Sequence, residues 1–380
     1  MVRKLLLAAL LAAASVPVCA DEVKLPPTLS VTAYDTGSSG FNIAIAVGKA
    51  FKDKYGTDLR VLPAGNDVAR LAPVRANRAQ FSSMGIGIYY AQEAVFEFAV
   101  KEWGPQRLQL LYTSNDCNGA ALGVAKDTGV KELKDLKGKR VATVVGSPAL
   151  NQNVFAALTF GGLTPADVRL VEFSSFGAAW KGFVNNEVDA AWASTITGQA
   201  REAETSPRGL VWMPMPHADK DAWARMLKQA NFFAPHIATC GAAGMSPQNP
   251  LESATYPYPI FTAYATQNTD LVYSITKAMI TLYDKYKDAA PGAAGMALDK
   301  QLLEWVIPYH PGAVKALTEA GAWTPKHEAH NQALLKRQDV INTAWTAFLK
   351  TNPPEASFRK DWMQARKDAL VKAGMHVIFE

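Results

Sequence analysis

Two short glycine- and serine-rich stretches stand where they could bind an anion. Gly37-Ser38-Ser39-Gly40 precedes one predicted helix, and Gly146-Ser147-Pro148 precedes another. A helix that follows such a turn presents free backbone N–H groups at the positive end of its dipole. With the Ser38, Ser39 and Ser147 hydroxyls, these groups would hold a carboxylate through charge-assisted hydrogen bonds. The pattern predicts binding of an anion and no chemistry on it.

Enzyme chemistry has less support from the residue spacing. The G-x-S-x-G spacing of a hydrolase nucleophile is absent around Ser38 and Ser39. A secreted hydrolase that uses one of these serines therefore stands as the alternative hypothesis. The stretch His327-Glu328-Ala329-His330 lacks the H-E-x-x-H spacing that places two imidazoles on one helix face. We expect no catalytic residue, no metal and no cofactor.

A weak internal repeat organises the chain. Three pairs of corresponding residues are each separated by 109 positions, namely Gly37 and Gly146, Leu59 and Val168, and Phe81 and Ala190. What repeats is mainly the order strand, small-residue turn, helix, strand, helix, strand, which is a βαβ series. The sequence therefore predicts two similar α/β lobes with a cleft between them.

Hydrophobic periodicity and turn residues place the elements of both lobes. The first copy predicts strands at 29–34, 59–63 and 81–84 and helices at 41–55, from 66 or 67, and at 88–101. The second copy predicts strands at 141–145, 167–173 and 189–193 and helices after Pro148 and at 178–185. Further helices are predicted at 270–286, 310–320 and 326–350, with a last one that ends before Gly374.

The domain boundaries follow from this pattern. We expect a signal peptide at 1–20, a second lobe at 119–240, and a discontinuous first lobe made of 21–118 and 241–380. The C-terminal helices of the last segment are expected to brace the first lobe or the hinge. Cys117 and Cys240 stand near the ends of the second lobe, so they form either a disulfide or two separate buried thiols.

Candidate ligand contacts are expected on one rim. In open α/β sheets the ligand crevice lies at the carboxyl ends of the strands. Residues placed there or in the two turns are Gly37, Ser38, Ser39, Phe41, Asn66, Asp67, Arg70, Met84, Tyr90, Ser147, Asn151, Phe176, Trp192 and Ser194. Arg70 would pair with a second ligand carboxylate or with Asp67. The aromatic residues, with Trp180, would wall the cleft or fill a core.

The N-terminal segment predicts where the protein is located, and the overall charge limits which kinds of partner it can bind. Arg3 and Lys4 precede an apolar run at 5–16, and Val18-Cys19-Ala20 follows with small residues. This is the pattern of a secretory signal peptide, cleaved after about Ala20, and predicts a periplasmic protein. Its removal lowers the formal net charge from +5 to +3. That balance is not typical of a nucleic-acid-binding protein, and no later segment predicts a membrane span.

Several motifs resemble the TAXI-type solute-binding proteins of TRAP transporters over about residues 28–323. The residues that carry this resemblance are Thr36-Gly37-Ser38-Ser39-Gly40, Asp135-Leu136-Lys137-Gly138-Lys139-Arg140-Val141 before Gly146-Ser147, Val188-Asp189-Ala190-Ala191, Tyr256-Pro257-Tyr258, and His310-Pro311-Gly312-Ala313 with Glu319-Ala320-Gly321. The late His-Pro-Gly-Ala segment is the most telling of them.

The resemblance implies a type II periplasmic-binding-protein fold, with two Rossmann-like lobes joined by a hinge. It also implies a small carboxylate ligand, such as glutamate or a related keto or dicarboxylic acid, and TRAP-type membrane permease subunits as partners. A receptor with the same fold that senses its ligand without transport is the other reading.

Overall fold

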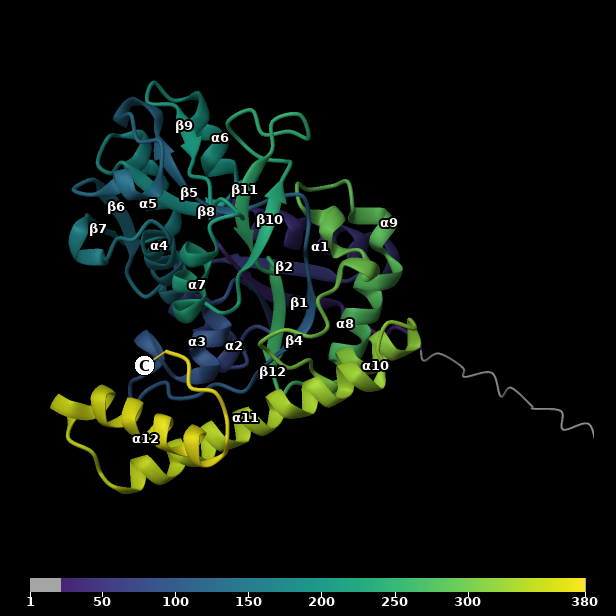
Figure 1. Cartoon of the computed structure of the whole chain (residues 1–380). Coiled ribbons are helices and arrows are strands. Elements are labelled where there is room, and N and C mark those ends of the chain that lie inside the picture. The colour runs from purple at the N-terminus through teal and green to yellow at the C-terminus, as the bar shows by residue number, and fades with distance from the viewer. Residues whose placement is uncertain (1–21, 380) are drawn as a thin grey trace, which may run out of the picture.

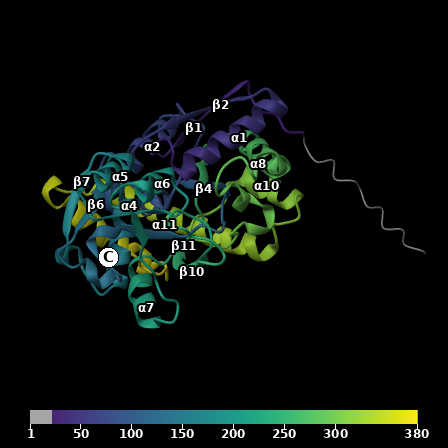
Figure 2. The ribbon, with the colours of Figure 1, turned by 90° about the horizontal axis from the view of Figure 1, so that it is seen from above.

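Two β-sheets, each covered by helices, divide residues 22–379 into two lobes in this computed structural model (Figure 1). The structure describes these residues only, so the expected signal peptide at 1–20 lies outside the described part. Figures 1 and 2 show the second lobe, in teal, beside the first, in purple and light green.

The first lobe is built on a five-stranded sheet with the order β2-β1-β3-β12-β4. Strands β1, β2 and β3 run parallel, and β12 is antiparallel to both of its neighbours. Its elements are β1 (Thr28–Ala33), α1 (Ser39–Tyr55), β2 (Asp58–Pro63), α2 (Asp67–Arg75), β3 (Phe81–Met84), α3 (Gly87–Glu93), β4 (Leu108–Thr113), β12 (Ile260–Tyr264), α8 (Thr269–Thr281), α9 (Tyr283–Tyr286) and α10 (Pro311–Glu319).

The second lobe is built on a seven-stranded sheet with the order β10-β11-β5-β8-β6-β7, and β9 also pairs with β5. Its elements are β5 (Ala120–Ala125), β6 (Arg140–Val144), α4 (Pro148–Phe160), β7 (Arg169–Phe173), α5 (Phe176–Val184), β8 (Ala190–Ser194), α6 (Gly198–Thr205), β9 (Leu210–Trp212), α7 (Lys220–Gln229), β10 (Ala234–Ala238) and β11 (Leu251–Thr255).

The internal repeat survives in the structure. The order β2-β1-β3 of the first sheet recurs as β7-β6-β8 in the second. Helices α1 and α4, helices α2 and α5, and strands β3 and β8 each begin 109 residues apart. The expected fold class, two Rossmann-like α/β lobes with extra C-terminal helices, is confirmed.

Local sequence explains why α1 forms where it does. The Ser38 hydroxyl accepts a hydrogen bond from the Phe41 amide, which caps the helix start. Gly56 ends the helix in the left-handed conformation, with φ of 73°. Between them, Ile43, Val47 and Phe51 lie on one face and are fully buried against the sheet. The helix start is thereby fixed at the carboxyl end of β1.

The chain crosses between the lobes twice, at residues 114–119 and at 256–259. The sequence places the return near 241, but β10 and β11 both belong to the second sheet, so the second lobe extends to Thr255. Cys117 and Cys240 form a disulfide with their Cα atoms 5.4 Å apart. This bond ties the first crossing segment to a loop of the second lobe.

The C-terminal extension consists of α11 (Pro325–Lys350) and α12 (Phe358–Lys372). Figure 1 shows α11 running along the lower side of the first lobe from α10, with α12 folded back beside it. The two helices meet α3 at Glu93, which is fully buried and pairs with Arg337 and Arg366.

The helix predicted at 88–101 ends much earlier, at Glu93. Ala94 adopts a left-handed conformation, with φ of 51°, and its carbonyl accepts a hydrogen bond from the indole N–H of Trp362 in α12. The C-terminal extension therefore supplies the hydrogen-bond donor for the Ala94 carbonyl, which follows the last residue of the helix. None of the described helices is both long and apolar enough to cross a membrane.

Candidate functional site

A cavity lies where the two lobes meet the crossing segments. Both lobes and both crossings line it, through Tyr34, Ser39, Asn118, Gly119, Ala120, Leu150, Phe176, Trp192, Ala193, Ser194, Thr197, Thr255, Tyr256 and Tyr258. Its volume is about 30 Å³, which is room for one or two water molecules. The lobes are therefore close together, and a larger ligand requires them to move apart.

Two buried polar atoms of the cavity wall make no hydrogen bond of normal geometry with the described residues, although one of them, in Ser39, lies close to the Tyr258 hydroxyl. They are Oγ of Ser39, which is 3% exposed, and Oδ1 of Asn118, which is 8% exposed. Asn118 donates its side-chain N–H to Ser194, 2.9 Å away. Because a buried polar atom without a partner costs free energy, these two atoms indicate where a polar ligand group would bind.

The start of α1 faces this cavity. Ser39 is the first residue of this 17-residue helix, and its first turn holds no acidic side chain. The Tyr258 hydroxyl also lies here, because a Cβ atom added to Gly40 would be 3.0 Å from it. Burial raises the pKa of Tyr258 to about 12. The phenol is therefore neutral near pH 7 and can donate a hydrogen bond to an anion.

The start of α4 is already occupied by a carboxylate of the protein itself. Oδ2 of Asp67 accepts hydrogen bonds from the Ala149 amide at 2.8 Å and from the Ser147 hydroxyl at 3.3 Å. Oδ1 of Asp67 pairs with Arg70, and both side chains have no exposed area. The Gly146-Ser147 turn of the second lobe therefore binds an acidic residue of the first lobe in this closed arrangement.

The starts of α5 and α6 are bound in the same way. Oδ2 of Asp35 accepts the Gly177 amide of α5 at 2.8 Å, and the Gly37 carbonyl accepts the Gly198 amide of α6 at 3.1 Å. The approach is close enough that a Cβ atom at Gly198 would lie 2.9 Å from the Gly37 oxygen. All three helices of the second lobe that begin at the cleft are capped by acceptors of the first lobe.

Arg70 is held away from the cavity. Its guanidinium donates to Asp67 and to the Ala64 carbonyl, and it lies 3.4 Å from the centre of the Tyr34 ring. Of the two pairings considered for Arg70, the one with Asp67 is the one found. Tyr34 separates this ion pair from the cavity.

The predicted site residues fall into three groups. Those that line the cavity are Ser39, Phe176, Trp192 and Ser194. Those that join the lobes to each other are Gly37, Asn66, Asp67 and Ser147. The remaining residues have local or core roles, as described next.

The two serine-rich turns do not face each other as expected. Ser38 caps its own helix, and Ser147 donates to Asp67, so neither hydroxyl lines the cavity. The Gly37 turn instead meets α6, and the Gly146 carbonyl accepts the Val68 amide of α2. The structure therefore does not bring the two turns together around one cavity, and only the start of α1 borders it, through Ser39.

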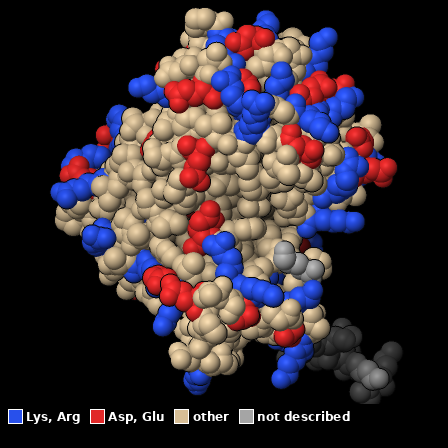
Figure 3. All heavy atoms as spheres, turned by 90° about the vertical axis from the view of Figure 1, so that its left-hand side faces the viewer, with Lys and Arg blue, Asp and Glu red and all other residues tan. Residues whose placement is uncertain are grey.

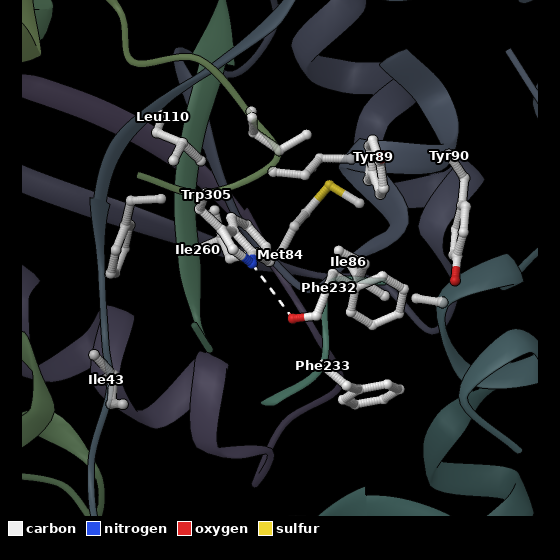
Figure 4. Close-up of a cluster of buried hydrophobic side chains, with 14 of the residues drawn as sticks. Ile43, Met84, Ile86, Tyr89, Tyr90, Leu110, Phe232, Phe233, Ile260 and Trp305 are labelled. Atoms are coloured by element: carbon white, nitrogen blue, oxygen red, sulfur yellow. Dashed lines mark hydrogen bonds between the residues drawn. The ribbon is translucent and has the colours of Figure 1, made fainter. Parts of the chain in front are cut away.

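Four other predicted contacts have structural roles. Asn151 bonds with both backbone groups of Val144. Figure 4 shows Met84 and Tyr90 inside a hydrophobic cluster to which both lobes contribute, with Phe232 of the second lobe beside them. Phe41 is half-buried on α1 and does not line the cavity. Trp180, likewise considered as a wall of the cleft, is buried in the core of the second lobe.

Sequence reasoning missed Tyr34, Asn118, Tyr256 and Tyr258 as wall residues. Tyr256 and Tyr258 were visible as the Tyr-Pro-Tyr motif, and that motif was the available signal. Tyr34 ends the first strand region, and Asn118 sits in a crossing segment without a recognisable pattern. The aromatic rings meet edge to face, with centroid distances of 5.7 Å for Tyr34 and Tyr258 and 6.2 Å for Tyr34 and Phe176.

Neither a nucleophile with its base nor a metal cluster occurs in the described part of the chain at this site. The described wall residues include no His, Cys, Asp, Glu, Lys or Arg. Among residues 22–379, no group of three or more His, Cys, Asp and Glu side chains is placed to hold a metal ion. His327 instead accepts the Thr324 amide at the start of α11.

The surface charge is mixed. Figure 3 shows basic and acidic side chains interspersed over one face, with uncharged surface between them. This face has no continuous basic track of the kind that a nucleic-acid backbone requires.

Comparison with known families places the chain. The NMT1-like family model matches residues 32–321, about three quarters of the chain, so the protein belongs to the NMT1-like family. The match ends before α11, which leaves the C-terminal extension outside it.

The solved structures to which this chain is similar include the following three. The alkanesulfonate-binding protein SsuA from Xanthomonas axonopodis pv. citri, bound to MOPS, is 16% identical over 87% of this chain and 95% of that chain, with a TM-score of 0.45. The aliphatic sulphonate-binding SsuA from Escherichia coli is 14% identical over 92% and 89%, with a TM-score of 0.38. PhnD1 from Prochlorococcus marinus, in complex with methylphosphonate, is 12% identical over 70% and 92%, with a TM-score of 0.42.

Proposed function

We propose that this protein is an exported solute-binding protein that closes its two lobes on a small organic anion. It then delivers the anion to the permease subunits of a TRAP-type secondary transporter, as the resemblance to TAXI-type proteins implies. The observation that carries the proposal is the interlobe cavity, whose wall contains the Ser39 hydroxyl and the Asn118 carbonyl, both without a hydrogen bond of normal geometry to the described residues.

Hinge closure is the mechanism that this architecture favours. Only the segments 114–119 and 256–259 join the two sheets, so the lobes can rotate about them. A ligand that contacts Ser39 on one lobe and Trp192 on the other binds the closed state more tightly than the open one. It therefore shifts the equilibrium toward closure by its differential affinity.

The start of α1 is the proposed seat of the anionic group. Ser39, the first residue of this helix, lines the cavity together with Tyr258, whose neutral phenol can donate a hydrogen bond to an anion. The helix starts of the second lobe contribute to closure and not to ligand binding, because Asp67 and Asp35 already hold α4 and α5.

The hydrolase alternative receives less support. A serine nucleophile needs a base within hydrogen-bond reach, and the described wall holds neither histidine nor carboxylate. A serine-directed covalent probe tests it directly. Stoichiometric labelling of Ser39 would favour the enzyme.

The binding proposal is tested by thermal unfolding with a panel of small carboxylates and by native mass spectrometry of freshly purified protein. A ligand at 100 times its dissociation constant stabilises the folded state by about 2.7 kcal/mol. The variant Trp192→Ala should lose most of this shift. Ile45→Ala, an exposed position on the outer face of α1, is the control and should keep it. If no small anion shifts the melting temperature and none copurifies, the transport hypothesis fails.

A further inference from the structure

The walls of the interlobe cavity restrict the charge that a ligand can carry. The described wall residues include nine uncharged side chains with hydroxyl, amide or indole groups, and none that is ionised near pH 7. An ammonium group or a second carboxylate placed there would be desolvated without a partner of opposite charge, which is strongly unfavourable.

The nearest ion pair does not supply that partner. Arg70 and Asp67 neutralise each other, and both are fully buried behind Tyr34. The second oxygen of Asp67 is used by Ala149 and Ser147. Neither charge is available to a ligand in the closed state.

One place remains for a single negative charge, at the start of α1. Three observations meet there: a helix start with no acidic residue in its first turn, the buried Ser39 hydroxyl without a hydrogen bond of normal geometry to the described residues, and the Tyr258 hydroxyl beside Gly40. The corresponding starts of α4 and α5 are bound to carboxylates of the protein. Among the described helix starts named here, that of α1 is the one without a carboxylate of the protein, so it offers a seat for one carboxylate once the lobes part enough to admit a ligand.

The rest of the wall suits a flat, apolar body. Phe176 and Trp192 come from the second lobe, and Tyr34, Tyr256 and Tyr258 come from the first lobe and its crossing segment. Aromatic walls on both sides favour a planar group that they can contact by face or edge. Oδ1 of Asn118 is an acceptor without a donor, so it fits a hydroxyl on that body.

We propose that the ligand is a planar monocarboxylate without an amino group, of the benzoate or hydroxybenzoate type. This inference rests on the proposed function and narrows it. It replaces the expectation of glutamate or a dicarboxylic acid, because each of those brings a further charge that the described wall cannot pair.

The proposed ligand class is tested by isothermal titration calorimetry with five compounds, namely benzoate, 4-hydroxybenzoate, benzamide, succinate and glutamate. We expect the two aryl carboxylates to bind, and benzamide, which has the same shape without the charge, to bind at least about tenfold more weakly, because a charged hydrogen bond is lost. Succinate and glutamate should give no heat of binding.

The outcomes separate this inference from the function on which it rests. Tight binding of succinate or glutamate with no binding of the aryl acids would overturn the ligand class and leave the solute-binding function standing. Equal binding of benzoate and benzamide would overturn the single carboxylate seat. No binding of any small anion in this or a wider panel would remove both.

A pair of variants locates the seat. Ser39→Ala should weaken benzoate binding by about tenfold, since it removes one donor to the carboxylate, and should leave benzamide affinity nearly unchanged. Thr346→Ala, at an exposed hydroxyl of α11, is the matched control and should affect neither. Circular dichroism shows whether both variants are folded. Equal loss for benzoate and benzamide in folded Ser39→Ala would contradict the assignment.

Discussion

Asp67 joins the two lobes because its carboxylate acts as an anion toward a helix of the other lobe. The residue types predict that the helix start at Ser147 binds a carboxylate, and in the structure it does. That carboxylate belongs to the protein because α2 and α4 face each other when the lobes close. The same carboxylate also pairs with Arg70, so it interacts with both a guanidinium of its own lobe and a helix start of the other lobe.

Replacement of Asp67 should destabilise the closed protein. The variant Asp67→Asn keeps the shape but leaves the buried Arg70 without an opposite charge, so we expect the free energy of unfolding to fall by about 3 kcal/mol. Urea denaturation measures this loss, and small-angle scattering should show a larger radius of gyration.

Asp35→Asn is the matched comparison. Asp35 also caps a helix of the second lobe, but it is only half-buried and none of the described hydrogen bonds joins it to a cation. Its replacement should cost about 0.5–1 kcal/mol. Equal losses for the two variants would show that the buried Arg70 is not the reason for the larger effect.

His310 should make the stability of the protein depend on pH. Burial lowers the pKa of this fully buried side chain from 6.5 to about 4. Between these two values the unfolded chain binds the proton and the folded one does not, so stability falls as the pH drops from about 6.5 to 4. The full loss is about 3 kcal/mol.

The measurement compares urea denaturation at pH 7 and pH 4 for the wild type and for His310→Asn. Asparagine can still cap α10 but does not titrate. The carboxylates contribute equally to both proteins, so the wild type should lose more stability than the variant over this interval. An identical loss in both proteins would rule out His310 as the source.

At the scale of elements, the C-terminal helices are held by one buried carboxylate. Glu93 ends α3 and pairs with Arg337 of α11 and Arg366 of α12. These pairings lower the pKa of Glu93 against the opposing effect of its burial. The periodicity of α11 predicted the helix, but its surface is mostly polar, and no pattern identified the buried acid that it meets.

The variant Glu93→Gln should loosen the extension. Two buried guanidinium groups lose their counter-charge, so we expect a loss of about 3 kcal/mol and faster proteolysis between α10 and α11. Asp339→Asn is the control, because Asp339 also ties α11 to the first lobe through Arg107 but the pair is exposed. It should cost less than about 1 kcal/mol. A similar cost for both would mean that burial of the charges is unimportant.

At the scale of the whole molecule, the disulfide should stabilise the fold without controlling closure. Cys117 and Cys240 are 123 residues apart and enclose most of the second lobe. Replacing both by serine should lower the free energy of unfolding by about 4 kcal/mol, since the unfolded chain is no longer cross-linked. Ligand affinity should stay within about twofold, because the bond lies between a crossing segment and the second lobe. A large change in affinity would place the bond within the hinge motion.

The sequence predicted most of the fold because its signals are local. The helices predicted at 41–55, after Pro148 and at 178–185 are present as α1, α4 and α5, and the structure starts the first and the last of them two residues earlier, directly after the Ser38 and Ser175 caps. The predicted helix at 88–101 was wrong beyond Glu93, where Ala94 adopts a left-handed conformation and its carbonyl accepts a hydrogen bond from Trp362, a residue remote in sequence.

For the candidate site, the structure places only some of the predicted contacts on the wall of the interlobe cavity. Ser39, Phe176, Trp192 and Ser194 line the cavity, whereas Met84 and Tyr90 fill the core of the first lobe. Successive residues of a strand point to opposite faces of the sheet, and residues a few positions apart on a helix can face different neighbours. Spacing alone did not separate the cavity side from the core side at these positions.

The amino-acid order by itself determined the duplicated strands and helices and the free amide groups at the helix starts. Helix caps, turns and apolar periodicity each depend on a few neighbouring residues, so they can be recognised in the sequence. Only the tertiary structure decided what each helix start binds. That choice depends on how the two halves are placed against each other. This placement brings the Asp67 and Asp35 carboxylates of the first lobe to helix starts of the second lobe, and it brings no such carboxylate of the described residues to the start of α1.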